Sequence, residues 1–475
     1  MNRRHFIKNS SIFIAGYGIF KNELVDLMKF IKSTRKKIGN KKFAWGVASA
    51  AYQIEGSPSS DGKGLSIWDI FSHKKGKIKN AANGDIAVDF YHRYPEDIDL
   101  IKQMNMNAFR FSLSWSRIMP NGTGKLNQKG LDYYQQVIDK SLEKGIEPWI
   151  TLYHWDLPQL LEDKGGWTNR DIIGWFSEYV DICTRTFGDK VKKWIVLNEP
   201  MTFTGLGYYS GYHAPGKKGL RNFLPAVHHA ALCQSEGGRI ARGNVQNGDI
   251  GTAFSFSHVK PINKSEINIK ASQRVDAIIN RMFIEPSLGL GYPFDTVPSL
   301  RRMEKYFRPG DEAKLKFDFD FHGVQYYFRV VSKFSLIPPI LFARDIPPEK
   351  RDAIVNSIGL EVFPKGLYKV LKKVWQYEGV KKIVITECGV CFDDKIEFGS
   401  IHDKARLDYL KETIAYTTKA IENGIDINGY FVWSLTDTFE WSEGYGPRFG
   451  LVYIDYNNLN RNIKDSGLWF KDFLK

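Results

Sequence analysis

The chain has 475 residues, among them 32 Phe, 23 Tyr and 12 Trp, and a formal net charge of +14 at pH 7. Nine basic and two acidic residues lie within residues 1–38, so half of the excess charge is confined there. The rest is spread over residues 39–475, which argues against a nucleic-acid partner. The length suits a single α/β barrel, and the aromatic content suits both a large core and the stacking of sugar rings.

The N-terminal segment resembles a bacterial twin-arginine export signal. Arg3 and Arg4 precede Phe6 and Lys8, and a modest apolar run follows at residues 11–20,. That run is too short to span a bilayer as a mature helix, and no clear A-x-A cleavage site follows it. We assign residues 1–40 to a signal or anchor segment and expect a periplasmic or extracellular protein, with membrane contact only through an uncleaved segment. The alternative is a basic amphipathic helix on a cytoplasmic protein.

From residue 41 onward, apolar strand-like runs alternate with amphipathic helical patterns,. The strand-like runs are residues 43–49, 108–115, 147–155, 193–199, 248–258, 321–330, 382–387 and 428–435. The clearest helical patterns are residues 94–104, 128–144, 170–187, 225–242 and 403–423. Alternation predicts βαβ units, and eight strands favour closure into a (β/α)8 TIM barrel. Nothing divides residues 41–475, so we predict one domain with rim-loop insertions near Pro338-Pro339 and Pro347-Pro348.

Polar and aromatic side chains gather at the carboxyl ends of these strands, which face one mouth in such a barrel. They are Gln53, Glu55, Arg110, Trp115, His154, Trp155, Asp156, Asn198, Glu199, Tyr326, Tyr327, Glu387, Trp433, Glu440 and Trp441. Amide, imidazole, carboxylate and indole groups together suit a sugar, whose hydroxyls need hydrogen bonds and whose ring has an apolar face. No phosphate-binding glycine motif or H-E-x-x-H pair occurs, so we predict no cofactor and no metal.

Two of these residues have the same setting. Residues 193–199 and 382–387 are both β-branched apolar runs that end in a glutamate, Glu199 and Glu387. A single glutamate at a strand end often only caps the next helix. Two of them at one barrel mouth invite a paired-carboxylate mechanism.

The cysteines and one histidine pair are interpreted as packed side chains without a redox or metal-binding role. Four cysteines form no disulfide framework in a chain of this size, and Cys388 and Cys391 make a C-x-x-C without a second pair,. We interpret them as small packed side chains, although an exported protein could oxidise them. His228-His229 lies in a helical pattern and is interpreted as a packed helix face rather than a metal site,.

Seven segments, in this order, resemble the family 1 glycoside hydrolases, the β-glucosidase and β-galactosidase family. They are residues 43–56, 109–118, 151–158, 197–200, 385–387, 433–441 and 448–451. Each segment is a weak match alone, but together they are specific. The resemblance extends from about residue 40 to the end of the chain.

This resemblance implies a role for individual residues. Glu199 would be the general acid/base and Glu387 the nucleophile, with Arg110 and Tyr327 orienting Glu387. The sugar-binding residues would be Gln53, His154, Trp155, Asn198, Gln325, Trp433, Glu440, Trp441 and Phe449. A retaining mechanism places two carboxyls about 5 to 5.5 Å apart. The charge of Glu387 should then raise the pKa of Glu199.

Two positions depart from the family pattern. The sixth strand has Gln325-Tyr326-Tyr327 in place of Asn-Tyr-Tyr, which moves the amide by one methylene and could shift a hydrogen bond near the nucleophile or a second sugar. Cys388 replaces the Asn that follows the nucleophile, and we interpret it as a packing change. Gly389 is kept, so we expect the turn after this strand to be preserved,.

The predicted partner is a small-molecule β-glycoside or oligosaccharide. Glu440 stands where phospho-sugar members have a smaller residue, and a carboxylate there would repel a 6-phosphate,. We therefore expect unphosphorylated β-glucosides, β-galactosides or β-fucosides, while the aglycone is open. Two alternatives remain: a non-hydrolytic sugar-binding relative, and a transglycosidase that uses the same covalent intermediate.

Overall fold

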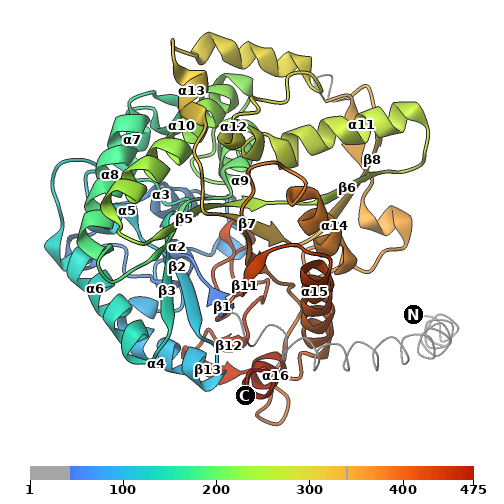
Figure 1. Cartoon of the computed structure of the whole chain (residues 1–475). Coiled ribbons are helices and arrows are strands. Elements are labelled where there is room, and N and C mark those ends of the chain that lie inside the picture. Colours follow the sequence, from blue (N-terminus) through green and yellow to red (C-terminus); the bar gives the residue numbers. More distant parts are fainter. Residues whose placement is uncertain (1–42, 338–340) are drawn as a thin grey trace, which may run out of the picture.

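The computed structural model describes residues 43–337 and 341–475. Eight parallel strands close into a barrel in the order β1-β2-β3-β4-β5-β7-β10-β11 (Figure 1). Their bounds are β1 (Ala44–Ala48), β2 (Ala108–Ser112), β3 (Glu147–Tyr153), β4 (Lys193–Asn198), β5 (Asp249–Ser255), β7 (Phe321–Tyr326), β10 (Ile383–Cys388) and β11 (Ile427–Trp433). Each of the eight predicted runs supplies one strand, which confirms the (β/α)8 barrel.

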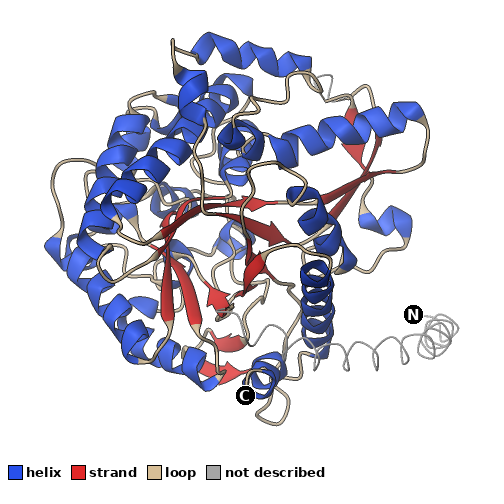
Figure 2. Cartoon of the chain, in the orientation of Figure 1, coloured by secondary structure: helices blue, strands red, loops and turns tan. Residues whose placement is uncertain are grey.

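Helices surround the barrel and cover the outer faces of its strands (Figure 2). The longer ones are α4 (Phe90–Gln103), α6 (Gln128–Glu143), α8 (Ile172–Phe187), α10 (Leu220–Asn244), α11 (Glu266–Asp276), α14 (Lys365–Val374), α15 (Lys404–Glu422) and α16 (Asp465–Phe473). Helix α14 shows why they pack there: Leu367, Val370, Leu371 and Val374 recur with helical spacing, and all four are buried,.

Three large rings fill the interior of the barrel. Trp149 of β3 lies with its ring centroid 5.5 Å from that of Phe321 on β7 and 5.1 Å from that of Phe431 on β11. Side chains from three separated strands can meet only inside the barrel, so this interior is a packed core. A cavity at the strand ends would therefore have a closed floor.

The predicted fifth and sixth strands were too long. Strand β5 ends at Ser255 and β7 at Tyr326, and the chain then forms β6 (His258–Pro261) and β8 (Arg329–Phe334). Strand β8 pairs with β6 on one side and with β9 (Ala343–Asp345) on the other, in a separate three-stranded sheet beside α11 (Figure 1). The apolar pattern continues across each bend, so the sequence does not show where the barrel strand ends.

Some predictions fall on parts of the chain that the structure does not describe. The export signal and Pro338-Pro339 lie outside the described residues, whereas Pro347-Pro348 leads into the short turn η7 (Pro348–Arg351) beyond β9. Within residues 43–337 and 341–475, no helix combines the length and the apolar character that a membrane span requires.

Candidate active site

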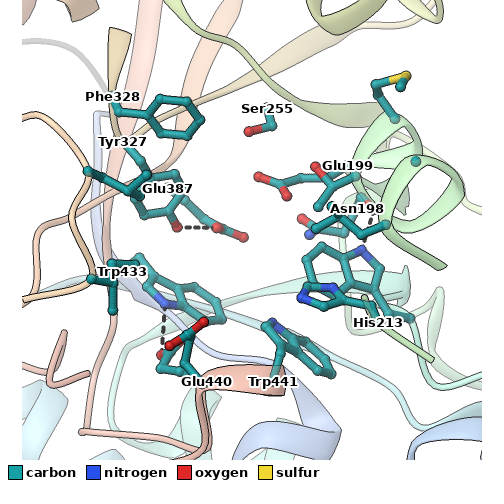
Figure 3. A pocket seen from close by; sticks show the side chains of 18 of the residues that line it. Asn198, Glu199, His213, Ser255, Tyr327, Phe328, Glu387, Trp433, Glu440 and Trp441 are labelled. Atoms are coloured by element: carbon teal, nitrogen blue, oxygen red, sulfur yellow. Dashed lines mark hydrogen bonds between the residues drawn. The ribbon is translucent and has the colours of Figure 1, made fainter. Parts of the chain in front are cut away.

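A cavity of about 560 Å³ lies at the carboxyl ends of the barrel strands. It is lined by ten of the predicted site residues: His154, Trp155, Asn198, Glu199, Tyr327, Glu387, Trp433, Glu440, Trp441 and Phe449. Figure 3 shows Glu199 and Glu387 facing each other across it. The other three, Gln53, Arg110 and Gln325, do not line the cavity but hydrogen-bond to residues that do.

Glu387, on β10, accepts three side-chain hydrogen bonds. Arg110 Nη1 and Gln325 Nε2 donate to Oε1 at 2.5 and 2.8 Å, and the Tyr327 hydroxyl donates to Oε2 at 2.5 Å. Burial raises the pKa of Glu387 above its usual value, and the charge of Arg110 and the hydrogen bond from Tyr327 oppose that rise,. These donors all favour the ionised carboxylate.

Arg110 holds several strands in place around this carboxylate. From β2 it donates to the Thr151 hydroxyl at 3.1 Å, to the Thr386 carbonyl at 3.1 Å and to Asn198 Oδ1 at 2.5 Å. The guanidinium is 1% exposed, and its planar fork connects β2 with β3, β4 and β10. The position of Glu387 is thus fixed by the barrel and not by a loop.

The hydrogen bonds around Asn198 define the tautomer of His154. Asn198 Oδ1 accepts from Arg110 and Gln325, so its amide nitrogen is the group that lies 3.0 Å from His154 Nε2. That nitrogen can only donate, so Nε2 accepts and the ring proton sits on Nδ1. Burial, then the charge of Arg110, lowers the pKa of His154 well below its usual value. His154 is therefore a neutral ring with a free donor, since Nδ1 has no partner among the described residues.

Glu199 follows the last residue of β4 and precedes the helix α9 (Pro200–Thr204). Its φ of 46° is left-handed, and Pro200 begins the helix at once, so the chain turns sharply at this residue,. Trp155 and Trp441 also have positive φ, of 82° and 53°. Strained backbone at three residues of one cavity is typical of a functional site.

Burial, followed by the charge of Glu387, raises the pKa of Glu199 to about 8. We predicted only the second cause from the sequence, and burial is the larger one. Hydrogen bonds with Thr202 and Ser255 oppose the rise. Unlike Glu387, Glu199 has no ion pair with a cation within residues 43–337 and 341–475, so we expect Glu387 to ionise first and Glu199 to keep its proton near neutral pH.

Glu440 lies at the other end of the cavity, beside two indoles (Figure 3). It accepts hydrogen bonds from the Thr438 hydroxyl at 2.7 Å, Trp433 Nε1 at 3.3 Å and Gln53 Nε2 at 3.3 Å. Burial raises its pKa to about 7. Gln53 Oε1 has no partner among the described residues, so this corner still offers hydrogen-bonding capacity,.

Four residues predicted at the mouth point elsewhere. Glu55 accepts a 2.9 Å hydrogen bond from Arg117 and is buried with it. Trp115, Asp156 and Tyr326 are also buried, and none of the four lines the cavity. Tyr326 is on β7, where successive side chains point to opposite faces, whereas Glu55, Trp115 and Asp156 lie in segments that follow the strands,. Position near a strand end is therefore not enough.

Cys388 also faces away from the cavity. Its sulfur lies 3.6 Å from the Tyr409 hydroxyl of α15, on the outside of the barrel. All four cysteines are free and buried, which confirms the packing interpretation. We predicted that a turn requires glycine at position 389, but the structure gives a different reason. A Cβ at this position would lie 2.0 Å from the Trp433 carbonyl oxygen. Close approach of β10 and β11 requires glycine.

His228 is packed, as predicted. Its ring stacks on Phe307 with centroids 4.1 Å apart, and Nε2 lies 2.9 Å from Asp311 Oδ2. Among the described residues, no group of three or more His, Cys, Asp or Glu side chains is arranged to hold a metal ion.

Several cavity residues were missed from the sequence. His213 is buried beside Trp155 and Trp441, and Met201 and Ile279 line the cavity from helical turns outside the barrel. They belong to no motif and lie on segments whose course only the fold determines.

Comparison with known proteins agrees with this geometry. The family model for "Glycosyl hydrolase family 1" matches residues 36–475. The chain belongs to this family. It is 43% identical to β-glucosidase A of Thermotoga maritima over 435 residues, which cover 91% of this chain and 97% of that protein. It is 40% identical to β-glucosidase A of Acetivibrio thermocellus over 447 residues, covering 92% and 98%.

The fold of this family 1 enzyme also matches a solved relative. The β-glucosidase from Thermotoga maritima in complex with glucoimidazole superposes with a TM-score of 0.87 and 43% identity, covering 91% of this chain and 97% of that one.

Proposed function

We propose that the protein is an exo-acting, retaining β-glycosidase that hydrolyses unphosphorylated β-glucosides, with β-galactosides and β-fucosides as related substrates. The observation that carries the proposal is the pair of facing carboxyls in different surroundings. Arg110 and Tyr327 favour the ionised form of Glu387, and burial favours the protonated form of Glu199. One acid and one nucleophile are what a retaining mechanism needs.

The first step forms a covalent intermediate. A Glu387 carboxylate oxygen attacks the anomeric carbon, the bond from that carbon to the aglycone oxygen breaks, and Glu199 gives its proton to this oxygen. In the second step Glu199, now ionised, takes a proton from water, whose oxygen attacks the anomeric carbon. The ester bond breaks and Glu387 is released as a carboxylate, so configuration is retained after two inversions.

The two carboxyls are coupled through this cycle. Once Glu387 is esterified, its charge no longer raises the pKa of Glu199, and the ionised form of Glu199 becomes more accessible. Burial still raises that pKa, so Glu199 remains a stronger base than an exposed glutamate,.

The inner end of the cavity supports binding of a terminal sugar. Trp433 and Trp441 offer apolar faces, while Glu440 with Gln53 and His154 Nδ1 offers hydrogen-bonding groups. The barrel core beneath is filled, which favours a chain end over a chain interior. No Lys or Arg is among the described residues that line the cavity, so a sugar phosphate would find no counter-charge,. Glucose is favoured because related structures hold glucoimidazole and deoxynojirimycin.

Product stereochemistry tests this proposal against its alternatives. The purified protein should release 4-nitrophenol from the β-glucoside, and proton NMR should show the β-anomer of glucose before mutarotation. Equal amounts of nitrophenol and free glucose indicate hydrolysis, whereas excess nitrophenol indicates transfer to an acceptor. Sugar binding without turnover would mean that the non-hydrolytic alternative is correct, and the α-anomer would exclude retention.

Gln325 is expected to be a positioning residue, because it donates to both Glu387 and Asn198. Replacing it by Leu should lower kcat/KM on aryl β-glucosides about 10-fold to 100-fold, the effect of one hydrogen bond to a charged group. Loss of a donor raises the pKa of Glu387, so the acid limb of the pH profile should move to higher pH. Gln325→Asn, which keeps the amide, should restore both quantities. An unchanged acid limb in Gln325→Leu would contradict this role.

A further inference from the structure

The cavity has an apolar outer part, which we call the vestibule. It is lined by Met201, Leu206, Ile279, Phe328, Ile358 and Leu360. All six belong to segments beyond the barrel strands, including α9, η4 (Gly205–Ser210) and η5 (Ala277–Arg281). Figure 3 shows Phe328 at the opposite end of the cavity from Trp433 and Glu440. A leaving group attached to a sugar between the two glutamates would enter the vestibule.

One wall of the vestibule is fixed in advance. Ile358 and Leu360 lie on a turn whose backbone amides both donate to Asn356 Oδ1, at 3.2 and 2.9 Å. Glu361, which follows, accepts from Arg329 at 2.8 Å and from Arg351 at 2.7 Å. This double ion pair ties the turn to β8 and η7, so the wall does not have to order when a ligand binds.

A second wall is supported from behind. Ile279 and Phe328 pack against a buried apolar cluster that contains Val275 and Val330, beneath the separate β6-β8-β9 sheet. Both side chains are half-buried, and both also line the cavity. Their exposed apolar surface is therefore available to a ligand without repacking.

Several polar groups near the vestibule are already engaged, although His213 Nδ1 in the same cavity has no partner among the described residues. The hydroxyls of Thr202 and Ser255 interact with Glu199. Glu443 at the mouth accepts hydrogen bonds from Tyr212 and from Lys79, the latter at 3.4 Å. A second sugar placed here would lose water from its hydroxyls and find few partners, which is unfavourable.

Given the proposed function, we propose that the vestibule is an aglycone site that selects alkyl or aryl groups over a second sugar. The physiological substrate class would then be β-glucosides of apolar alcohols or phenols rather than β-linked gluco-oligosaccharides. Affinity would come from burial of the aglycone against the two fixed apolar walls.

Alkyl chain length tests this directly. Methyl, butyl and hexyl β-glucosides have leaving groups of nearly equal basicity, so differences in kcat/KM report contact with the aglycone. Below their micelle concentrations, kcat/KM should rise on the order of 10²-fold from methyl to hexyl, if most of the added methylenes are buried. Cellobiose should be at least about 10-fold poorer than hexyl β-glucoside.

Two variants and a matched control locate the effect. Ile358→Asn and Ile279→Asn should each lower the ratio of hexyl to methyl kcat/KM about 10-fold. Ile354 lies on the same segment as Ile358 but is 74% exposed and does not line the cavity. Ile354→Asn should therefore leave the ratio as in the wild type.

The outcomes separate this inference from the proposed function. Hydrolysis of methyl β-glucoside with no chain-length dependence, or a preference for cellobiose, would contradict the aglycone-site proposal but leave the proposed glycosidase activity intact. No hydrolysis of any β-glucoside would contradict the proposed glycosidase activity. Calorimetry with hexyl and methyl β-glucoside would then still test the aglycone site, because equal affinities for the two would exclude it.

Discussion

Replacement of Glu387 by Gln is expected to lower kcat on aryl β-glucosides by at least about 10⁴-fold, as for other covalent nucleophiles. An amide oxygen cannot form the ester, and no other described carboxyl except Glu199 faces the same part of the cavity. The Gln amide oxygen can still accept from Arg110, and its amide nitrogen can donate to the Tyr327 hydroxyl oxygen, so the variant should fold,. Steady-state kinetics should be measured beside thermal unfolding.

The control for this variant is Glu397→Gln. Glu397 is exposed and lies ten positions further along the chain, outside the cavity. It should keep wild-type kcat. A fluorinated substrate that slows both steps should also add one glycosyl group to the wild type and none to Glu387→Gln, as seen by mass spectrometry. A variant with more than about one hundredth of wild-type activity would exclude Glu387 as nucleophile.

The Glu199→Gln variant is expected to lose activity according to the leaving group. Methyl β-glucoside needs a proton at its leaving oxygen, so kcat/KM should fall about 10²-fold to 10⁴-fold. A 2,4-dinitrophenyl leaving group needs none, so its kcat/KM should fall by less than about 10-fold. The kcat of the variant on this dinitrophenyl substrate should nevertheless drop, because water then attacks the ester without a base. A burst of dinitrophenol should therefore appear in stopped-flow traces. Equal losses on both substrates would argue against the acid role.

The same variant should change the pH profile. Glu199 must be protonated in the first step and its pKa is raised to about 8, so wild-type kcat/KM should fall as the pH rises through that value,. Glu387 must be ionised, and burial raises its pKa, so the rate should also fall at acid pH. On methyl β-glucoside, whose leaving group needs the proton, the wild type should show both limbs and Glu199→Gln only the acid limb. A wild-type rate that stays constant well above pH 8 would contradict the assignment.

Much of this enzyme is determined by local sequence. Buried parallel strands read as unbroken apolar runs, so all eight barrel strands could be predicted, and with them the two strand ends that carry Glu199 and Glu387,. The family resemblance then assigned most of the inner cavity, and ten of those residues do line it. These features depend on residue type and on position within one strand.

Tertiary structure decided what depends on contacts between distant segments. The sequence could not show that Gln325 reaches both Glu387 and Asn198, or that Cys388 faces Tyr409 and Glu55 faces Arg117. The raised pKa of Glu199 comes first from burial, which is a property of the assembled cavity. The vestibule also cannot be recognised in the sequence, because its walls come from helical turns and loops whose apolar residues follow no period. Only packing brings them to one side of the cavity.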